Sequence, residues 1–457
     1  MDSPQGGAPL DVRPVADDAT LELLRAWVPA QRWFPAKGER TTIERLGVAE
    51  LADPRGEALV QVHVLELGSG ALLQVPTVLH PGPGPGDLSG PDGPGVIGVI
   101  GGVDGGTLVD GPHDPAFVRA WFASATRDAD LSDDVGEARV LTGEQSNTSV
   151  VLAGATPPAI LKVFRGLTVG PNPDVEVPLA LSHAGWTGVP RPLAWLGGAW
   201  PGHEGGHRGG TESGHLGVLT ELVTGAQDGF RLACAMARDG QDFGALADDL
   251  GRTTAQMHRA LRVALPVREH LPRAPRSRAA EVHHVTTVLR ERAAAAADRV
   301  PAVDERLAAV DAVYAEVDRL EGVAPLQRVH GDYHLGQVLR SADGRWYVLD
   351  FEGEPQASAA DKTRPDLALR DLAGMLRSID YAAWVGAAPD PWASVARERL
   401  VAGYHRESGT MPGDPVTDLL LRALELDKAI YEVVYESTNR PTWVTIPLAG
   451  VDRLLTH

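Results

Sequence analysis

The chain of 457 residues has a single cysteine, Cys234, so no disulfide can form within it. Because stable disulfides belong to oxidising compartments, this scarcity favours a reducing cytoplasm. The first residues, MDSPQGGAPLDV, lack the basic and apolar regions of a signal peptide. No apolar run approaches the roughly 18 residues that a membrane-spanning helix needs. We therefore expect a cytoplasmic protein without a membrane partner.

Basic side chains are fewer than acidic ones. The chain has 42 lysines and arginines and 61 aspartates and glutamates, which gives a formal net charge of −19. A negative field of this size repels nucleic acid and anionic lipid, so no nucleic-acid partner is predicted. Hydrophobic residues make up 43% of the chain, which is enough to bury cores. At roughly 100–200 residues per domain, the length predicts several domains.

The first part of the chain favours strands. Residues 58–67 and 71–79 alternate between apolar and polar side chains and are joined by GSG, which predicts a β-hairpin. Residues 21–34 have the apolar spacing of a helix. The Pro/Gly-rich tract at 81–95 has too few apolar residues to pack and is predicted to be a linker. These patterns predict an N-terminal cap subdomain over residues 1–87.

The next part, residues 88–224, mixes strands with helices. A helix is predicted from Asp114, a capping residue, with Pro115 at its first position. The Gly-rich stretch 197–215 is predicted to be a surface loop. The other expected elements are strands at VIGVIGG, GTLVDG, 149–154, 159–165 and 216–225, and a helix at 174–185. This part is predicted to hold an intermediate subdomain and the small lobe of a kinase.

Residues 225–457 turn mostly helical. The helical periodicity is clearest at 243–261, 288–300, 305–320 and 417–436. A strand-rich half followed by a larger helical half is the layout of a bilobal, protein-kinase-like α+β fold. We expect the catalytic residues and the acceptor site in this helical lobe.

One short stretch carries the chemistry. VHGDYHLGQVLR contains Asp332 and Gln337, and the following apolar strand WYVLD ends at Asp350. Transfer of a phosphoryl group from ATP needs one carboxylate near the attacking hydroxyl and further oxygen ligands for magnesium. The order acid, amide, hairpin turn, strand, acid is that of the protein-kinase catalytic loop. The sequence therefore predicts a phosphotransferase.

Several motifs together resemble one kinase family. HGDYHLGQ, LDFEGEP, GEQSNTSVVL, ILKVFR, NPDVE, LRDLAGMLRSIDYAAW and DKAIYEVVYESTNRPTW resemble the actinobacterial maltokinase and glucosamine kinase group of the aminoglycoside phosphotransferase-like kinases. The resemblance implies a bilobal fold with an N-terminal cap, ATP and Mg²⁺ as cofactors, and a small sugar as substrate. It also implies a monomer or a weak homodimer.

The family's usual pattern, HGDxHxxN followed by an aspartate on the next strand, implies roles for this chain. Asp332 is expected to be the catalytic base. Gln337 stands where most relatives have asparagine, and with Asp350 it is expected to bind magnesium. Glu352 is expected to join or organise this metal site.

The nucleotide contacts follow from the same resemblance. Lys162 in ILKVFR matches the lysine that pairs with the phosphates, and Glu176 in NPDVE matches its carboxylate partner. The phosphate loop is expected at 142–149, and because it lacks GxGxxG its contacts should come from backbone N–H groups and hydroxyls. Its expected cofactor-binding residues are Gln145, Ser146, Asn147 and Thr148, and those of the adenine hinge are Glu221 and Val223.

The acceptor stays open between two sugars. Glucosamine, phosphorylated at its six-hydroxyl, is cationic near neutral pH and should need carboxylates in its pocket, whereas maltose, phosphorylated at its anomeric hydroxyl, is neutral. An acidic lining, and DLALRD in place of the Ser-Pro-Leu-Arg-Asp run of maltose-using relatives, favour glucosamine first and maltose second. The expected substrate contacts, besides Asp332, are His334, Asp371, Asp380, Glu432, Glu436 and Trp443.

An alternative hypothesis, from another functional class, is that the protein is a non-catalytic pseudokinase or an assembly partner. The presence of Lys162, Glu176, Asp332 and Asp350 argues against it, because a pseudokinase usually lacks at least one such residue.

Overall fold

The computed structural model describes residues 9–38, 40–82, 95–102, 105–132, 136–141, 146–204, 207–267, 278–354 and 362–456. The chain folds into two compact units. The first comprises Met1–Leu179 and Pro190–Thr224, and the second comprises Ala180–Val189 and Gly225–His457. Helix α3 (Pro173–His183) begins in the first unit and ends in the second.

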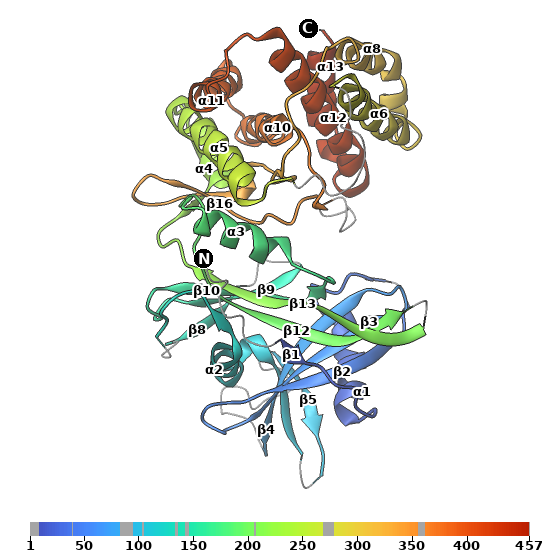
Figure 1. The fold of residues 1–457 in the computed structure, drawn as a ribbon, viewed down its shortest axis with the longest axis vertical. Helices are drawn as coiled ribbons and strands as arrows, with labels where there is room; N and C mark the ends of the chain where they lie inside the picture. Colours follow the sequence, from blue (N-terminus) through green and yellow to red (C-terminus); the bar gives the residue numbers. More distant parts are fainter. Residues whose placement is uncertain are drawn as a thin grey trace. The chain divides into compact units, whose positions relative to one another are not determined.

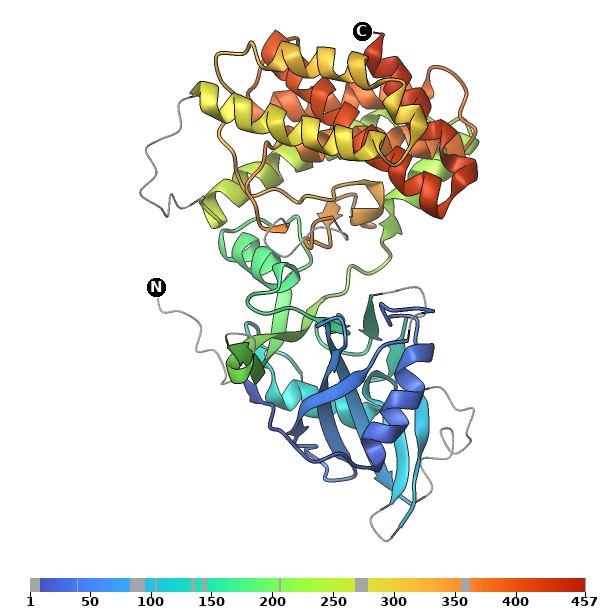
Figure 2. The same cartoon turned by 90° about the vertical axis from the view of Figure 1, so that its right-hand side faces the viewer.

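The first unit contains an antiparallel sheet with the strand order β2-β3-β4-β6-β5. Helix α1 (Ala19–Trp27), which continues into the 3-10 turn η1 (Val28–Ala30), packs on this sheet and shares a buried apolar core with it (Figure 2). The predicted hairpin is confirmed as β3 and β4, and the predicted strands at VIGVIGG and GTLVDG as β5 and β6. The bounds are β2 (Ile43–Leu51), β3 (Leu59–Leu67), β4 (Leu72–Pro81), β5 (Val96–Ile100), β6 (Gly106–Asp110) and β11 (Gly166–Leu167), which pairs with β4.

A second sheet of the first unit has the order β1-β12-β13-β10-β9-β8, with β7 paired to β12. The prediction of a loop at 197–215 was wrong, because most of it forms the long antiparallel pair β12 and β13. Its glycines allow close packing, since a Cβ at Gly214 would lie 2.3 Å from the carbonyl oxygen of Thr168. The bounds are β1 (Leu10–Asp11), β7 (Thr126–Arg127), β8 (Ala138–Val140), β9 (Asn147–Leu152), β10 (Ala159–Phe164), β12 (Pro192–Glu204) and β13 (His207–Glu221).

Helix α2 (Pro115–Ser124), which follows the 3-10 turn η2 (Gly111–His113), joins the two sheets through one core. Asp114 caps the helix by accepting from the N–H of Ala116, and a proline stands at its first position, as predicted. Phe117 and Trp121 of α2 belong to a buried cluster that takes residues from both sheets. The sheet of the cap, which runs on to Asp110, is therefore packed into the first unit rather than standing apart.

The second unit is mostly helical. Helix α10 is buried on nearly all sides although it carries Asp371 and Arg377, and α12 packs against it (Figure 1). A small sheet, β14-β15-β16, precedes it with the 3-10 turn η3. The bounds are α4 (Gly229–Arg238), α5 (Gly244–Ala264), α6 (Arg278–Ala297), α7 (Pro301–Asp304), α8 (Leu307–Val317), α10 (Leu369–Val385), α11 (Trp392–Ser408), α12 (Pro415–Asn439), η4 (Pro441–Trp443), α13 (Thr445–Leu455), β14 (Gln227–Asp228), η3 (Leu335–Gln337), β15 (Val338–Arg340) and β16 (Trp346–Val348).

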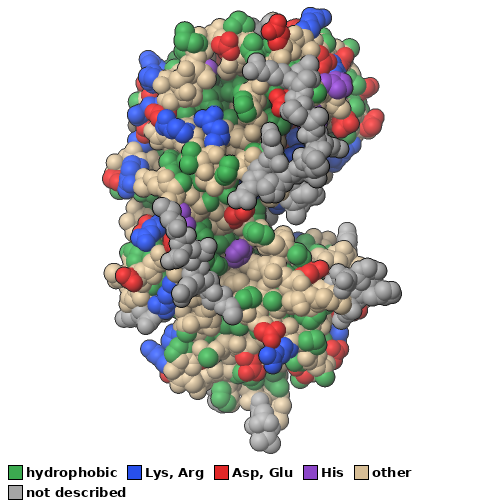
Figure 3. Space-filling model, viewed as in Figure 1, with side chains coloured by type: hydrophobic (Ala, Val, Ile, Leu, Met, Phe, Trp, Pro, Cys, Tyr) green, Lys and Arg blue, Asp and Glu red, His purple; other side chains and the backbone are tan. Residues whose placement is uncertain are grey.

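The surface of the second unit carries both charge signs. On the face seen in Figure 3, acidic and basic side chains are interspersed rather than gathered by sign. Within the described ranges, no helix has the length and apolar character to cross a membrane.

Candidate active site

Residues 330–337, named here the HGD loop, run into β15 in the second unit. The ring of His330 fixes the loop from inside, because its Nδ1 accepts from the N–H of Asp332 at 3.3 Å. The other ring nitrogen, Nε2, therefore carries the proton and donates to the carbonyl oxygen of Leu349 at 2.7 Å. This second bond ties the loop to the segment that carries Asp350.

Helix α10 holds the same loop from behind. The carboxylate of Asp371 accepts from the backbone N–H groups of His330 at 2.9 Å and Gly331 at 3.0 Å, and it also lies 3.0 Å from Nε2 of His258. Burial opposes its charge, but the hydrogen bond and the proximity of His258 hold the pKa of Asp371 below its ordinary value. Asp371, expected to contact the sugar, is therefore occupied in holding the loop.

The predicted metal ligands come together in the second unit. The amide Nε2 of Gln337 donates to Oδ2 of Asp350 at 3.1 Å, which leaves the amide oxygen as a possible ligand. Asp350 follows β16 with a φ of 60°, a left-handed conformation uncommon outside glycine and often found at functional sites. A carboxylate oxygen of Glu352 lies within 4.8 Å of one of Asp350.

Asp332 has a partner that sequence reasoning missed. The ammonium Nζ of Lys428, on α12, lies 3.2 Å from Oδ1 of Asp332 and 3.5 Å from Oε1 of Glu354. Burial disfavours the ammonium, but these two carboxylates raise the pKa of Lys428 above its ordinary value. The only sequence signal was a lysine within DKAIYEVVYE, a stretch that its periodicity marks simply as an amphipathic helix.

His334, the remaining substrate candidate in the loop, caps the 3-10 turn η3. Its Nδ1 accepts from the N–H of Gly336 at 3.0 Å, and its Nε2 lies 3.9 Å from Oδ2 of Asp332. Burial lowers the pKa of His334, which favours the neutral ring. The ring therefore lies beside the predicted base without adding a positive charge.

A cavity of about 570 Å³ opens beside the HGD loop within the second unit. Helices α6 and α12 form two of its walls, and Gly331 and Glu354 line it next to Asp332 and Lys428. This size lies within the range of small-molecule pockets. Its charged lining among the described residues is Arg292, Arg299, Lys362, Arg364 and Arg370 on the positive side and Glu354, Asp366 and Asp427 on the negative side.

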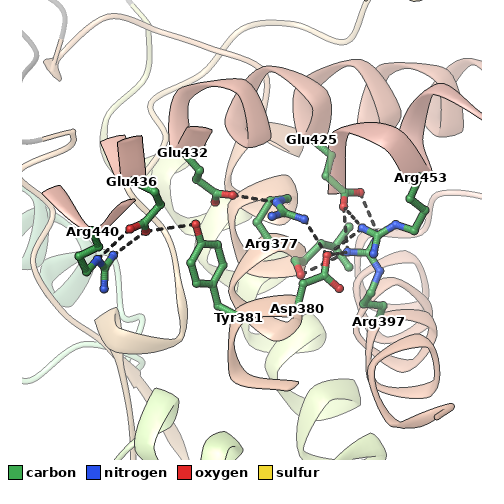
Figure 4. Close-up of polar contacts among 10 residues, drawn as sticks. Arg377, Asp380, Tyr381, Arg397, Glu425, Glu432, Glu436, Arg440 and Arg453 are labelled. Atoms are coloured by element: carbon green, nitrogen blue, oxygen red, sulfur yellow. Dashed lines mark hydrogen bonds and ion pairs between the residues drawn. The ribbon is translucent and has the colours of Figure 1, made fainter. Parts of the chain in front are cut away.

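Three further carboxylates expected at the sugar are engaged by arginines (Figure 4). Asp380 accepts from Arg377 at 2.8 Å, Arg453 at 2.7 Å and Arg397 at 3.2 Å. Glu432 accepts from Nε of Arg377 at 2.9 Å.

Glu436 is paired in the same way, because Oε1 accepts from Arg440 at 2.6 Å and from the hydroxyl of Tyr381 at 3.2 Å. The ring of Trp443 lies under the same guanidinium, with its centroid 4.5 Å from Cζ of Arg440. The free negative charge that the sequence argument required for an amino sugar is therefore absent from Asp371, Asp380, Glu432 and Glu436 as they stand in the structure.

The first unit holds the predicted nucleotide residues. Lys162 projects from β10 and forms an ion pair with Asp174 in the first turn of α3. The prediction named Glu176 as this partner, so the ion pair observed is with a different carboxylate, two positions earlier in the chain. The side chain of Asn172 accepts from the N–H of Asp174 at 2.9 Å, which fixes the start of the helix that carries this carboxylate.

The expected phosphate loop is described only from Ser146 onward, so Gln145 lies outside the described residues. The hydroxyl of Ser146 accepts from the amide of Asn147 at 3.3 Å. The hydroxyl of Thr148 accepts from Nε of the buried Arg165 at 2.8 Å, which ties it to the core. Glu221 ends β13, where its N–H donates to the carbonyl of Arg191 at 2.9 Å, and Val223 follows in the segment that leaves the first unit.

Comparison with known proteins agrees with this geometry. Residues 137–420 match the model of the phosphotransferase enzyme family, and residues 27–114 match the maltokinase N-terminal cap domain. The chain belongs to the phosphotransferase enzyme family. The predicted α+β fold with an N-terminal cap is thereby confirmed, and so is the resemblance on which it rests.

Two relatives of this phosphotransferase are glucosamine kinases. The one from Streptacidiphilus jiangxiensis is 30% identical over 367 residues, which is 75% of this chain and 77% of the relative. The one from Mycolicibacterium smegmatis is 30% identical over 338 residues, covering 69% and 79%. A solved glucosamine kinase in complex with glucosamine, ADP and inorganic phosphate shares the fold, with a TM-score of 0.63 and 24% identity over 96% of this chain and 100% of that one.

Proposed function

We propose that this phosphotransferase is a sugar kinase that transfers the γ-phosphoryl group of Mg-ATP to glucosamine, giving glucosamine 6-phosphate. Glucosamine as the acceptor is supported by the two glucosamine kinases that are 30% identical to this chain over most of its length. The observation that carries the kinase chemistry is the contact of Gln337 with Asp350. The same loop holds the backbone of Asp332 by a hydrogen bond to His330.

Asp332 is the group that orients the sugar hydroxyl and accepts its proton. The HGD loop suits this task, because His330 and Asp371 hold its backbone by three hydrogen bonds that involve no substrate, and a fourth ties His330 to the carbonyl of Leu349. A base held in one orientation needs no rearrangement before proton transfer.

Magnesium fits the donors that the loop presents. Gln337, Asp350 and Glu352 offer amide and carboxylate oxygens, which are the ligands that this hard cation prefers. Bound there, the ion would neutralise charge on the phosphate oxygens during transfer. Lys162, kept in place by Asp174, supplies a further positive charge for the α- and β-phosphates.

The proposal extends to the setting of the enzyme. Its substrate is a small sugar, and it acts in the cytoplasm as a monomer or a weak homodimer. Size-exclusion chromatography with light scattering of the full chain tests the oligomeric state directly.

An ADP-release assay on the purified full chain tests the function. Glucosamine, maltose, glucose, N-acetylglucosamine and aminoglycosides are compared at equal concentration. Glucosamine should give the highest kcat/KM, and Asp332→Asn should lower kcat by roughly 10²–10⁴-fold with little change in ATP affinity. Full activity of Asp332→Asn would remove the assigned base.

Maltose is a second candidate, because specific observations favour a neutral acceptor. Lys428 places a positive charge against Asp332, and the carboxylates named above are already paired. The match to the maltokinase N-terminal cap domain points the same way. ADP release with maltose and none with glucosamine would make maltose 1-phosphate the product.

A further inference from the structure

The side chain of Lys428 is fixed at one place in the acceptor region. It is 15% exposed, and its Nζ lies 3.2 Å from Oδ1 of Asp332, 3.5 Å from Oε1 of Glu354 and 4.8 Å from the ring centroid of Tyr431. These neighbours face it from the HGD loop, from the segment after β16 and from its own helix. The charge of Glu432, on the same helix, also acts on this ammonium. A partly buried ammonium among these neighbours has little freedom to move away from Asp332.

Glu354 is itself shared between Lys428 and a second cation. Nη2 of Arg292 lies 3.4 Å from the same Oε1 of Glu354 that Lys428 approaches, and Nε of Arg292 lies 3.1 Å from Oδ1 of Asp427. Asp427 in turn accepts from Nη1 of Arg370 at 2.8 Å. Cations and carboxylates therefore alternate from Asp332 into the wall of the cavity.

The charged lining of the cavity includes, among the described residues, five arginines or lysines and three carboxylates, with His284 as the remaining titratable group besides tyrosine. Gly331 and Glu354 of this lining are neighbours of Asp332 and Lys428, so an acceptor that reaches Asp332 from the cavity also comes close to the ammonium of Lys428. That ammonium costs a cationic sugar binding energy and leaves a neutral sugar unaffected.

We propose that Lys428 is a specificity-determining residue that excludes positive charge from the neighbourhood of the hydroxyl that Asp332 orients. The inference rests on the proposed sugar kinase function. A neutral sugar can present any hydroxyl to Asp332. Glucosamine can react only with its ammonium turned away, through a hydroxyl remote from the amino group, which is discrimination by repulsion rather than by attraction.

The test compares glucosamine with glucose, which has a hydroxyl in place of the amine. The ratio of their kcat/KM values is measured for the wild-type enzyme, for Lys428→Gln and for the charge-preserving Lys428→Arg. Removing the ammonium should raise the ratio by roughly tenfold, because a charge a few ångströms away in a partly buried site has about that effect. The Lys428→Arg ratio should stay within about threefold of wild type, since the charge remains.

A second measurement uses the wild-type enzyme alone, so it does not depend on how the variants fold. The ratio is followed from pH 6.5 to about pH 9, through the range in which an amine such as that of glucosamine loses its proton. The ratio should rise with pH in the wild type and rise less in Lys428→Gln.

The outcomes separate this inference from the function on which it rests. Equal loss of activity with both sugars in Lys428→Gln, together with a wild-type ratio that does not rise with pH, would show that Lys428 only supports the fold and would overturn the inference. No ADP release from the wild type with either glucosamine, glucose or maltose would instead overturn the proposed function, and the inference with it.

Discussion

The amide of Gln337 donates to Oδ2 of Asp350 at 3.1 Å, although the two residues stand 13 positions apart. The hairpin of β15 and β16 brings them together, because Val338 pairs with Val348 in antiparallel register. The strand pairing thus places an amide and a carboxylate together at the two ends of one hairpin. This relationship makes the metal site the part of the proposal that is simplest to test.

Asp350→Asn should abolish most of the magnesium-dependent activity. The substitution keeps the shape but removes the charged ligand, so we expect kcat/KM for Mg-ATP to fall by at least about 10²-fold. The increase in melting temperature that Mg-ADP gives the wild type should shrink in the variant. Glu352→Gln is the matched comparison, and a larger loss there than in Asp350→Asn would exchange the roles of the two carboxylates.

Asp371→Asn should damage the HGD loop rather than sugar binding. Asparagine offers one acceptor oxygen where the carboxylate serves two backbone N–H groups and His258. We expect a loss of about 1–3 kcal/mol in the free energy of unfolding, by urea denaturation, and a lower kcat. The KM for the sugar should change little; a rise in that KM with stability unchanged would restore Asp371 as a substrate contact.

Asp110→Ala should destabilise the first unit strongly. Nη2 of Arg165 lies 2.6 Å from Oδ2 of Asp110, and neither side chain is more than 4% exposed. Removing the carboxylate leaves a buried guanidinium unpaired, which costs about 3–5 kcal/mol of unfolding free energy. Urea denaturation followed by tryptophan fluorescence measures it, with Asp11→Ala, which breaks the exposed Arg13 pair, as the control that should change little.

His63 should make the first unit less stable in acid. Burial, with a smaller effect of Arg45, lowers the pKa of His63 to about 3, whereas an unfolded histidine titrates near about 6.5. The unfolded chain therefore binds a proton that the folded chain refuses. Stability from this residue is complete above about pH 6.5 and falls, by up to about 1.4 kcal/mol per unit, as the pH drops toward 3.

Urea denaturation at several pH values tests this dependence. His63→Gln, which retains a polar partner for Thr77, should flatten the fall between about pH 6.5 and pH 4. His283→Gln, on the exposed side of α6, is the control. An unchanged slope in His63→Gln would mean that the acid sensitivity comes from carboxylates alone.

Local patterns predicted much of the fold. The hairpin of β3 and β4, the capped start of α2 and the hairpin between Gln337 and Asp350 all rest on neighbours in sequence, and all were confirmed. The prediction of a loop at the Gly-rich stretch 197–215 was wrong. A strand that pairs with a long antiparallel partner tolerates a composition that propensity assigns to a loop.

The partners of the charged residues were not predictable in the same way. Lys428 meets Asp332 across 96 positions, and Arg377 meets Glu432 across 55. A sequence shows that a carboxylate is present but not whether a distant arginine has neutralised it. For this reason the prediction of carboxylates at the sugar did not foresee their arginine partners, while the order of Asp332, Gln337 and Asp350 was sufficient to predict the reaction class.

By itself, the sequence determined the secondary structure around the HGD loop, the order of the acid and amide groups and the class of chemistry, because these depend on residues close together along the chain. Only the tertiary structure decided the charge around Asp332. The packing of α12 and α10 against the loop brings Lys428 and Asp371 to it from distant positions, and the energy of a charge depends on what lies within a few ångströms in space.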